Sequence, residues 1–463
     1  MSQILDLGAR QILNAFRSRE LSPVEYMQAL IARVEASEPW VQALWLFRPE
    51  RSLSEARASE TRYAQGVPLG LLDGMPVTVK ELIATQGDHV PLGTAATPHS
   101  PAAEDAPSAA RLREDGAIMF AKTTCPDYGM LTSGLSSFHH LSRNPWDLSQ
   151  NPGGSSSGSS AAGAAGYGPL HLGTDIGGSI RLPAGWTGLF GLKPSLGRVP
   201  IDPYYTGRVV GPMTPAVDDA ALLMRTVTRP DWRDATAVKP EEIDWDAGPA
   251  DVRGMRIGLM VDAGCGLPVH PEVAAAIAAA ARQFEANGAI IVPLPGVLTR
   301  EMLDGLDIAW RARFWGQMLK LPTEAREKIL PYIREWAEVG ASASPVAVAE
   351  GFDQTFAMRR AANEALHGLD FILSPVNPMQ SYPADWPSPT NDPARPFEHI
   401  AFTVAWNMGE QPAASIHCGM TSTGIPIGLQ IVGHRFDDLG VMRVARAYEE
   451  WRGPITTWPR HDR

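Results

Sequence analysis

The stretch GGSSSGSSAAGAAGYGPLHLGTDIGGSIRLPA, residues 153–184, is made almost entirely of glycine, serine, alanine and short apolar residues. A flexible linker would continue as polar low-complexity sequence. Here the serine-rich start runs directly into a small-residue segment at 159–166, which predicts a helix, and then into LHLGTD at 170–175, which predicts a strand. Glycine lets backbone segments approach one another closely. The stretch therefore belongs to a packed core rather than to a linker.

Two kinds of functional loop have a glycine-rich pattern similar to that of this stretch. A phosphate-binding loop needs a lysine after its last glycine, and no lysine follows here. Residues 154–158 do fit the Gly-x-Ser-x-Gly nucleophile elbow of α/β-hydrolases, centred on Ser156. That elbow requires a strand immediately before it, and WDLSQNPGG at 146–154 predicts no good strand. The elbow stays open as a minor alternative.

The rest of the chain alternates predicted strands with predicted helices. Ser22 to Glu25 form a capping box with proline at the first helical position, which starts a helix. Further helices are predicted at 108–115 and 271–288, and strands at 75–79, 118–121, 255–261, 289–294, 371–376 and 424–433. This pattern is typical of an α/β fold with a mixed, largely parallel central sheet covered by helices on both faces. We find no linker and no repeat, so we expect a single domain over 1–463, with its core at about 70–220 and a helical section at about 300–367.

Composition narrows the classes of function. The chain has 463 residues, 44% of them hydrophobic and 20% charged, with a net charge of -11 that is spread along the sequence. This excludes nucleic acid as a main partner, and no run approaches the ~18 apolar residues of a membrane span. The amino-terminal segment has no signal-peptide pattern, so we expect a cytoplasmic protein. Either a monomer or a homodimer is compatible with the sequence.

The cysteines and histidines do not predict a metal centre. Cys125, Cys265 and Cys418 are few and far apart, which fits a reducing compartment with free thiols. No Cys-x-x-Cys or His-x-x-x-His spacing is present, and the adjacent pair His139 and His140 would point in different directions. We expect no metal and no cofactor.

Taken as a whole, the segment at 153–184 closely resembles the signature segment of the amidase signature family. LDGMPVTVKELIATQG at 72–87 resembles the lysine motif of that family, and GPMTPAVDDAALLM at 211–224 and the carboxy-terminal stretch at 407–438 also follow its pattern. The resemblance extends from about residue 5 to about residue 450. It implies the amidase signature fold and the activity of a hydrolase.

Carried over residue by residue, the resemblance implies a serine–serine–lysine triad with Ser179 as nucleophile, Ser155 as bridging serine and Lys80 as base. It also implies a cis peptide bond before Ser155. One departure from the family pattern is Ser157, which stands where a glycine is common; all three triad positions are intact.

The same residues make chemical sense by themselves. A serine hydroxyl needs a base within hydrogen-bond reach, and lysine is a base only when burial keeps it neutral. Lys80 follows an apolar run that predicts such burial, although a lone lysine at a strand end is more often at the surface. The backbone N–H groups of Ile176, Gly177 and Gly178 are placed to hold a developing oxyanion. We expect Arg181 and Asp175 to be structural.

The substrate is less determined. Aromatic side chains in the loop after the signature could stack on an aryl group, or could simply pack on the surface. The candidate substrate-binding residues are Gly129, Tyr204, Tyr205, Arg208, Trp406 and Gln411. We expect hydrolysis of small amides, aryl or aliphatic, and of carbamates. The alternatives are a glutaminase-type subunit of an amidotransferase, which would need partner chains, and a non-catalytic binding protein on the same fold.

Overall fold

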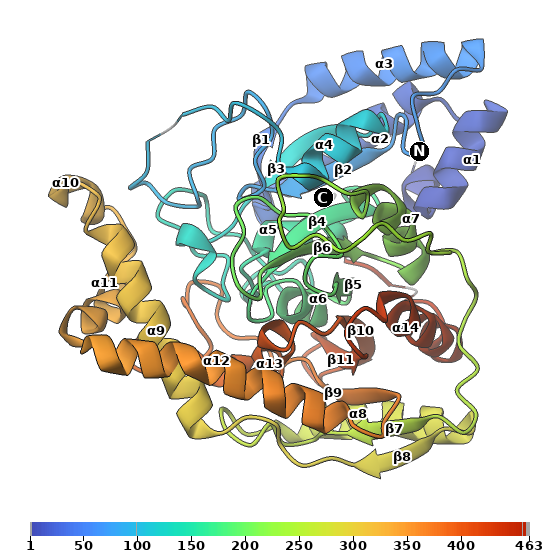
Figure 1. Cartoon of the computed structure of the whole chain (residues 1–463). Helices are drawn as coiled ribbons and strands as arrows, with labels where there is room; N and C mark the ends of the chain where they lie inside the picture. Colours follow the sequence, from blue (N-terminus) through green and yellow to red (C-terminus); the bar gives the residue numbers. More distant parts are fainter. Residues whose placement is uncertain (1, 99, 456, 460–463) are drawn as a thin grey trace.

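A single mixed sheet of eleven strands runs through the molecule (Figure 1). The computed structural model describes residues 2–98, 100–455 and 457–459. The strands lie in the order β1-β3-β2-β4-β6-β5-β10-β11-β9-β7-β8. Their bounds are β1 (Leu44–Phe47), β2 (Pro76–Lys80), β3 (Ile118–Thr123), β4 (Leu170–Asp175), β5 (Phe190–Lys193), β6 (Val209–Thr214), β7 (Arg256–Leu259), β8 (Ile290–Pro293), β9 (Phe371–Pro375), β10 (Ala413–Met420) and β11 (Pro426–Val432).

The direction of the strands corrects one expectation. The α/β class and the mixed sheet are confirmed, but the sheet is not largely parallel. Between neighbouring strands of the described chain, four pairs are parallel (β2–β3, β2–β4, β7–β8 and β7–β9) and six are antiparallel. The parallel pairs lie in two groups towards the ends of the sheet, and an antiparallel centre joins them.

Helices cover both faces of this sheet (Figure 1). On one side, α7 contacts α4 and α14, and α14 contacts α8. On the other side, α5 and α6 contact each other and the middle strands. A group formed by α9, α11, α12 and α13 adjoins these layers. The bounds are α1 (Ala9–Ser18), α2 (Pro23–Val41), α3 (Pro49–Gln65), α4 (Pro107–Glu114), α5 (Ser157–Ala164), α6 (Arg181–Thr187), α7 (Val217–Val227), α8 (Pro271–Ala286), α9 (Arg300–Met318), α10 (Thr323–Arg326), α11 (Pro331–Glu338), α12 (Pro345–Leu366), α13 (Val404–Met408) and α14 (Asp438–Arg452).

The predicted capping box is confirmed at the start of α2. The Ser22 hydroxyl accepts a hydrogen bond from the Val24 amide at 2.9 Å, and the Glu25 carboxylate accepts one from the Ser22 amide at 3.0 Å. These two bonds satisfy backbone donors that the first turn of a helix leaves unpaired.

The sheet brings two segments together that are distant in sequence. β2 and β4 are parallel neighbours, with Val79 paired to Leu172. Parallel strands end at the same edge of a sheet. Lys80, the last residue of β2, and Thr174, near the end of β4, therefore lie side by side at one edge.

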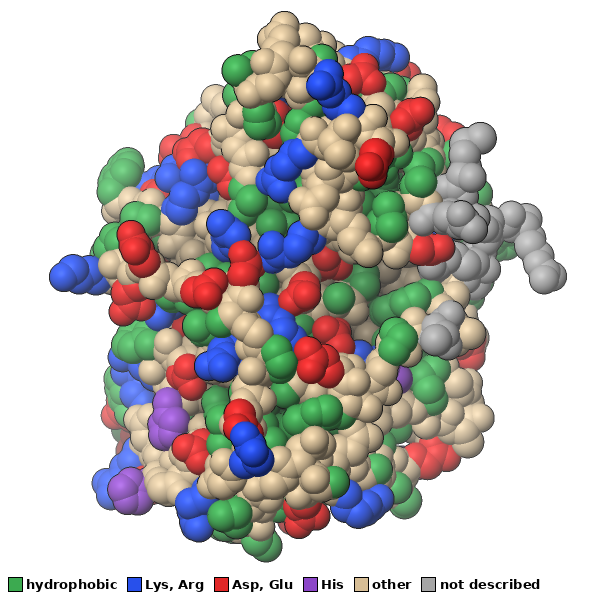
Figure 2. Space-filling view, turned by 90° about the vertical axis from the view of Figure 1, so that its right-hand side faces the viewer, with side chains coloured by type: hydrophobic (Ala, Val, Ile, Leu, Met, Phe, Trp, Pro, Cys, Tyr) green, Lys and Arg blue, Asp and Glu red, His purple; other side chains and the backbone are tan. Residues whose placement is uncertain are grey.

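The surface carries mixed charge. On the face shown in Figure 2, basic and acidic side chains are interspersed. Among the described helices, none combines the length and the apolar character needed to cross a membrane.

Candidate active site

Lys80 is a fully buried lysine surrounded by hydroxyl groups. Its Nζ lies 2.8 Å from Ser155 Oγ, 2.8 Å from Thr174 Oγ1 and 3.1 Å from Ser156 Oγ. Burial disfavours the ammonium form and lowers the pKa of Lys80 to about 8, and the positive charge of Arg208 acts in the same direction. A neutral amine is therefore accessible near neutral pH.

Two other buried lysines have different partners. The Nζ of Lys122 donates to the carbonyl oxygen of Ile83 and, at 3.1 Å, to Thr85 Oγ1. The Nζ of Lys193 donates to the carbonyl oxygen of Pro194 at 2.9 Å. A carbonyl oxygen has no proton to give. Lys80 differs because all three of its partners are hydroxyls, which can both accept and donate hydrogen, whereas the one hydroxyl beside Lys122 donates its hydrogen to Asp88 at 2.7 Å.

The hydrogen bonds of Ser156 fix its role toward Lys80. Its Oγ donates to the carbonyl oxygen of Thr174 and accepts from the amide of the same residue, both at 3.2 Å. Since the hydroxyl hydrogen is used, Ser156 accepts from Lys80 and orients the amine. Ser156 is fully buried, and no strand lies at 146–154 in the described chain, which disfavours the nucleophile-elbow alternative. Neither this contact nor Thr174 was foreseen, because both depend on the pairing of β2 with β4.

Ser155 lies where three backbone segments meet. The Gly154–Ser155 peptide bond is cis, as the family resemblance implied. A Cβ at Gly154 would lie 2.5 Å from the amide nitrogen of Ser133, so only glycine fits there. A Cβ at Gly129 would lie 3.3 Å from Ser155 Oγ, which places the Gly129 backbone beside this hydroxyl.

A cavity of about 490 Å³ opens onto Ser179. Its wall includes five of the other predicted site residues: Gly129, Ile176, Gly177, Tyr205 and Arg208. The remaining wall is mostly apolar or aromatic, with Leu82, Leu92, Tyr128, Met130, Leu131, Trp310, Phe314, Tyr332, Phe397 and Ile400 among its members. A cavity of this size and lining accommodates a small organic molecule.

The loop between β4 and α6, which carries Ser179, is built around a buried carboxylate. Asp175 accepts hydrogen bonds from the amides of Gly178 at 2.8 Å and Ile180 at 3.1 Å, and forms an ion pair with Arg181 at 3.0 Å. Both charged side chains are fully buried, and the guanidinium holds the pKa of the Asp175 carboxyl well below its usual range despite that burial. The expected structural role of this pair fits these contacts.

The same contacts correct one predicted oxyanion donor. The Gly178 N–H points at Asp175 Oδ1 and is already satisfied. Within the described residues, the N–H groups of Ile176 and Gly177 have no hydrogen-bond partner, and both residues line the cavity. They remain the donors available for an oxyanion.

Three predicted binding residues lie away from the cavity wall. Tyr204 is 47% exposed, whereas Trp406 is fully buried and donates its indole N–H to the carbonyl oxygen of Phe402 at 2.9 Å. Gln411 is buried and donates to the side chain of Asn363 at 2.8 Å. None of the three is among the residues that surround the described cavity.

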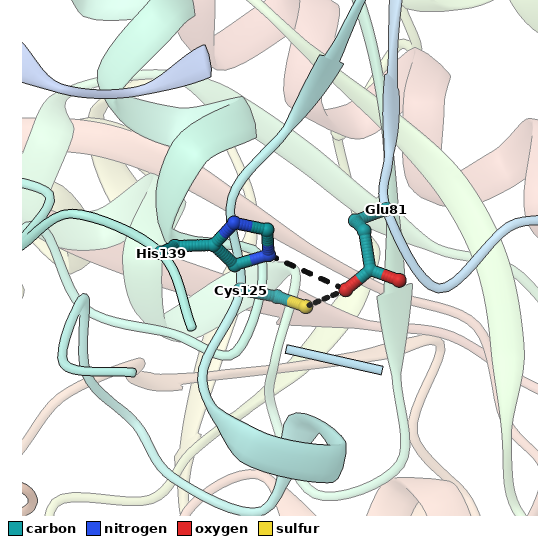
Figure 3. Close-up of side chains that lie close together, drawn as sticks. All are labelled: Glu81, Cys125 and His139. Atoms are coloured by element: carbon teal, nitrogen blue, oxygen red, sulfur yellow. Dashed lines mark hydrogen bonds and ion pairs between the residues drawn. The ribbon is translucent and has the colours of Figure 1, made fainter. Parts of the chain in front are cut away.

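The structure also brings together three residues that the sequence left apart. Cys125 Sγ lies 3.3 Å and His139 Nε2 lies 3.4 Å from the same oxygen of Glu81. Figure 3 shows the two side chains converging on that oxygen. Glutamate, cysteine and histidine are all metal ligands, and these three are buried with their ligand atoms within 4.8 Å of one another.

The surroundings of Glu81 favour an anchoring role over a metal site. Its carboxylate also accepts hydrogen bonds from the amides of Leu92 at 2.9 Å and Gly93 at 2.5 Å. The thiol, the imidazole and the two amides together occupy its oxygens. Glu81 thereby fixes the loop at 92–93, part of the cavity wall, directly beside Lys80.

Comparison with known proteins agrees with this geometry. The family model described as Amidase matches residues 25–442. A glutamyl-tRNA(Gln) amidotransferase subunit of Anaeromyxobacter dehalogenans (strain 2CP-C) is 32% identical, with 99% of this chain and 98% of that protein covered. A bacterial aryl acylamidase of the amidase signature family superposes with a TM-score of 0.90 at 27% identity, covering 98% of each chain. A 6-aminohexanoate cyclic dimer hydrolase superposes with a TM-score of 0.87 at 25% identity, covering 99% of this chain and 100% of that one. The chain belongs to the amidase signature family of hydrolases.

Proposed function

We propose that this protein hydrolyses small amides that carry apolar or aromatic groups, through a covalent acyl-enzyme formed on Ser179. The observation that carries the proposal is the environment of Lys80: a fully buried amine, with its pKa lowered to about 8, in hydrogen-bond contact with the Ser155 hydroxyl. An amine poised in this way can act as a general base near neutral pH.

The Lys80–Ser155 contact and the family resemblance support the following steps. Neutral Lys80 accepts the proton of Ser155 while Ser155 takes the proton of Ser179, and Ser179 Oγ attacks the amide carbonyl carbon. The N–H groups of Ile176 and Gly177 stabilise the negative oxygen of the tetrahedral intermediate. The carbon–nitrogen bond then breaks, and the proton returns through Ser155 to the leaving amine. Water, activated by the same relay, hydrolyses the ester and releases the acid.

The cavity supports apolar and aromatic substrates. Tyr128, Trp310, Phe314 and Phe397 line it, so it can surround an aryl or alkyl group. The structural likeness to an aryl acylamidase and to a hydrolase of a 6-aminohexanoate cyclic dimer supports the same substrate class. A carbamate presents a similar carbonyl to the nucleophile, so carbamates form a further substrate class for the same relay.

A second candidate is the glutaminase reaction of an amidotransferase. The identity of 32% to an amidotransferase subunit over nearly the whole chain favours it. Free glutamine carries an ammonium group as well as a carboxylate, and Asp202 is the one carboxylate that the largely apolar wall of the described cavity offers to an ammonium group. Ammonia release from glutamine by this chain, raised by a co-purifying partner protein, would support the second candidate. Faster hydrolysis of anilides than of glutamine, without a partner, would support the first.

Serine substitutions test the mechanism. With an anilide substrate, Ser179→Ala should lower kcat by more than a thousandfold while circular dichroism and the melting temperature stay near those of the wild type. Ser155→Ala should be nearly as inactive. Ser156→Ala should lose less, about tenfold, because it only orients Lys80. A Ser179→Ala protein that keeps a tenth of the wild-type rate would rule out this nucleophile, and a Ser156→Ala protein less active than Ser155→Ala would favour the elbow.

A further inference from the structure

Arg208 has an unpaired guanidinium in the wall of the cavity. The residue is half-buried, immediately before β6, and lines the same cavity as Ser179. Its Nε is shielded from solvent and has no hydrogen-bond partner among the described residues. Among the described residues, no carboxylate lies within ion-pair distance of the Arg208 side chain. Removing a cation partly from water costs free energy when no partner replaces the lost hydration.

Three other buried arginines of this protein are paired, whereas Arg33 in α2, like Arg208, has a guanidinium nitrogen without a hydrogen-bond partner among the described residues. Arg181 forms an ion pair with Asp175, Arg198 with Asp438, and Arg311 with Asp307. Arg181 and Arg198 pair with carboxylates of other elements. Arg311 pairs within α9, and its guanidinium also donates to the carbonyl oxygens of Trp336 and Pro393, which belong to other segments. Arg208 differs in that its side chain joins no such segments and faces a cavity instead.

The charges around Arg208 leave a positive region at this wall. Arg313, from α9, stacks on the ring of Tyr205 with its guanidinium carbon 3.7 Å from the ring centroid. Arg313 and Tyr205 both line the cavity, as does one acidic residue, Asp202. Two guanidinium groups and one carboxylate therefore share a wall that is otherwise mainly apolar.

We infer that Arg208 binds a carboxylate on the substrate, so that the preferred substrates are amides that also carry a carboxylate group. A guanidinium presents parallel N–H donors that match the two oxygens of a carboxylate. The apolar wall would hold the carbon skeleton between this anionic group and the scissile amide. The inference rests on the proposed amide hydrolysis and names its substrate class.

Two matched pairs of substrates test it. Glutaric acid monoanilide and valeranilide differ by a carboxylate on the acyl side. Para-acetamidobenzoate and para-acetotoluidide differ by a carboxylate on the amine side. For each pair we measure the ratio of kcat/KM between the charged and the neutral member, in the wild type and in variants. Comparing ratios between proteins removes the intrinsic reactivity of each substrate.

Arg208→Gln should lower this ratio by about ten- to hundredfold in at least one pair, chiefly through a higher KM for the charged member. Arg208→Lys keeps the charge but not the planar fork, so its ratio should be intermediate. Arg253→Gln is the matched control, because Arg253 is exposed and pairs only locally with Asp251; its ratios should equal those of the wild type.

Equal ratios in the wild type and Arg208→Gln, in both pairs, would overturn the inference while leaving amide hydrolysis intact. If the wild type cleaves none of the four anilides, the result contradicts the proposed function instead. Calorimetry then measures how tightly the same four compounds bind to Ser179→Ala, which tests the inference separately. Tighter binding of the charged members that Arg208→Gln abolishes supports it, and equal binding of charged and neutral members overturns it.

Discussion

At the scale of single residues, the protonation of Lys80 should set the pH dependence of the reaction. Its pKa is lowered to about 8 by burial, and only the neutral amine is a base. We therefore expect kcat/KM to rise with pH through about 8 and to level off above it. A histidine base would give a rise near ~6.5 instead. The measurement is a pH–rate profile with an anilide substrate.

Lys80→Arg provides the control for this profile. Arginine stays charged over the whole range, so the variant should be inactive at every pH and the rise should disappear with the activity. Substantial turnover by Lys80→Arg with an unchanged profile would contradict a lysine base.

The residue scale is also where sequence and structure can be compared most directly. The sequence placed Lys80 after a buried run, and the structure shows it buried and in contact with Ser155. Thr174 could not be assigned as a partner of Lys80, because that contact arises from the register of β2 and β4. Ser156 could not be assigned either, because two hydrogen bonds to Thr174 hold its hydroxyl beside the amine. Glu81 and Cys125 were likewise separated by 44 positions, and only folding brings them together.

At the scale of elements, the connection from β4 to α6 depends on the Asp175–Arg181 pair. Asp175→Asn keeps the shape of the side chain but leaves the fully buried Arg181 without a neutralising charge. Breaking a buried pair in this way costs about 3–5 kcal/mol, and we expect the free energy of unfolding to fall by that amount. Activity should fall as well, because the same carboxylate fixes the loop that carries Ser179. Chemical denaturation and an anilide assay measure the two effects.

Asp251→Asn is the matched control for this variant. Its pair with Arg253 is exposed and local, so its loss should leave the unfolding transition and the activity near the wild-type values. Equal stabilities of Asp175→Asn and Asp251→Asn would show that the buried pair does not hold the loop.

The strands show how far local pattern predicts this sheet. β2, β3, β4, β7, β8, β9 and β11 were predicted, and every parallel pair lies among them. The missed strands were β1, β5, β6 and β10. β1 and β5 have only four residues each, and β6 follows a loop rich in glycine, proline and tyrosine. These four strands take part in most of the antiparallel pairs, so missing them made the sheet look largely parallel.

At the scale of the whole molecule, stability should depend on a buried carboxyl that ties the amino-terminal helix to the core. Asp219, in α7, accepts a hydrogen bond from the Ala9 amide of α1 at 2.7 Å. Burial, with the negative charges of Glu449 and Asp218, raises the pKa of Asp219 to about 7. The folded state therefore keeps a proton that the unfolded state loses near ~3.9, so this residue favours folding less as the pH rises towards 7.

Asp219→Asn keeps the acceptor and cannot ionise. Its melting temperature relative to the wild type should therefore increase between pH ~5 and pH ~8. Asp218→Asn, at an exposed neighbouring position, should show a smaller change over that range. A difference between Asp219→Asn and the wild type that stays constant with pH would contradict the raised pKa. Thermal melts at several pH values provide the test.

The complete burial of Lys80 also limits how protons can travel. The amine has no exposed surface, and hydroxyls of Ser155, Ser156 and Thr174 surround it. A proton that arrives through Ser155 during acylation has no direct route to bulk water, and it leaves by the same hydroxyl on the departing amine. In the mechanism proposed here, each half-reaction is therefore a closed proton shuttle, and the turnover rate should not depend on buffer concentration.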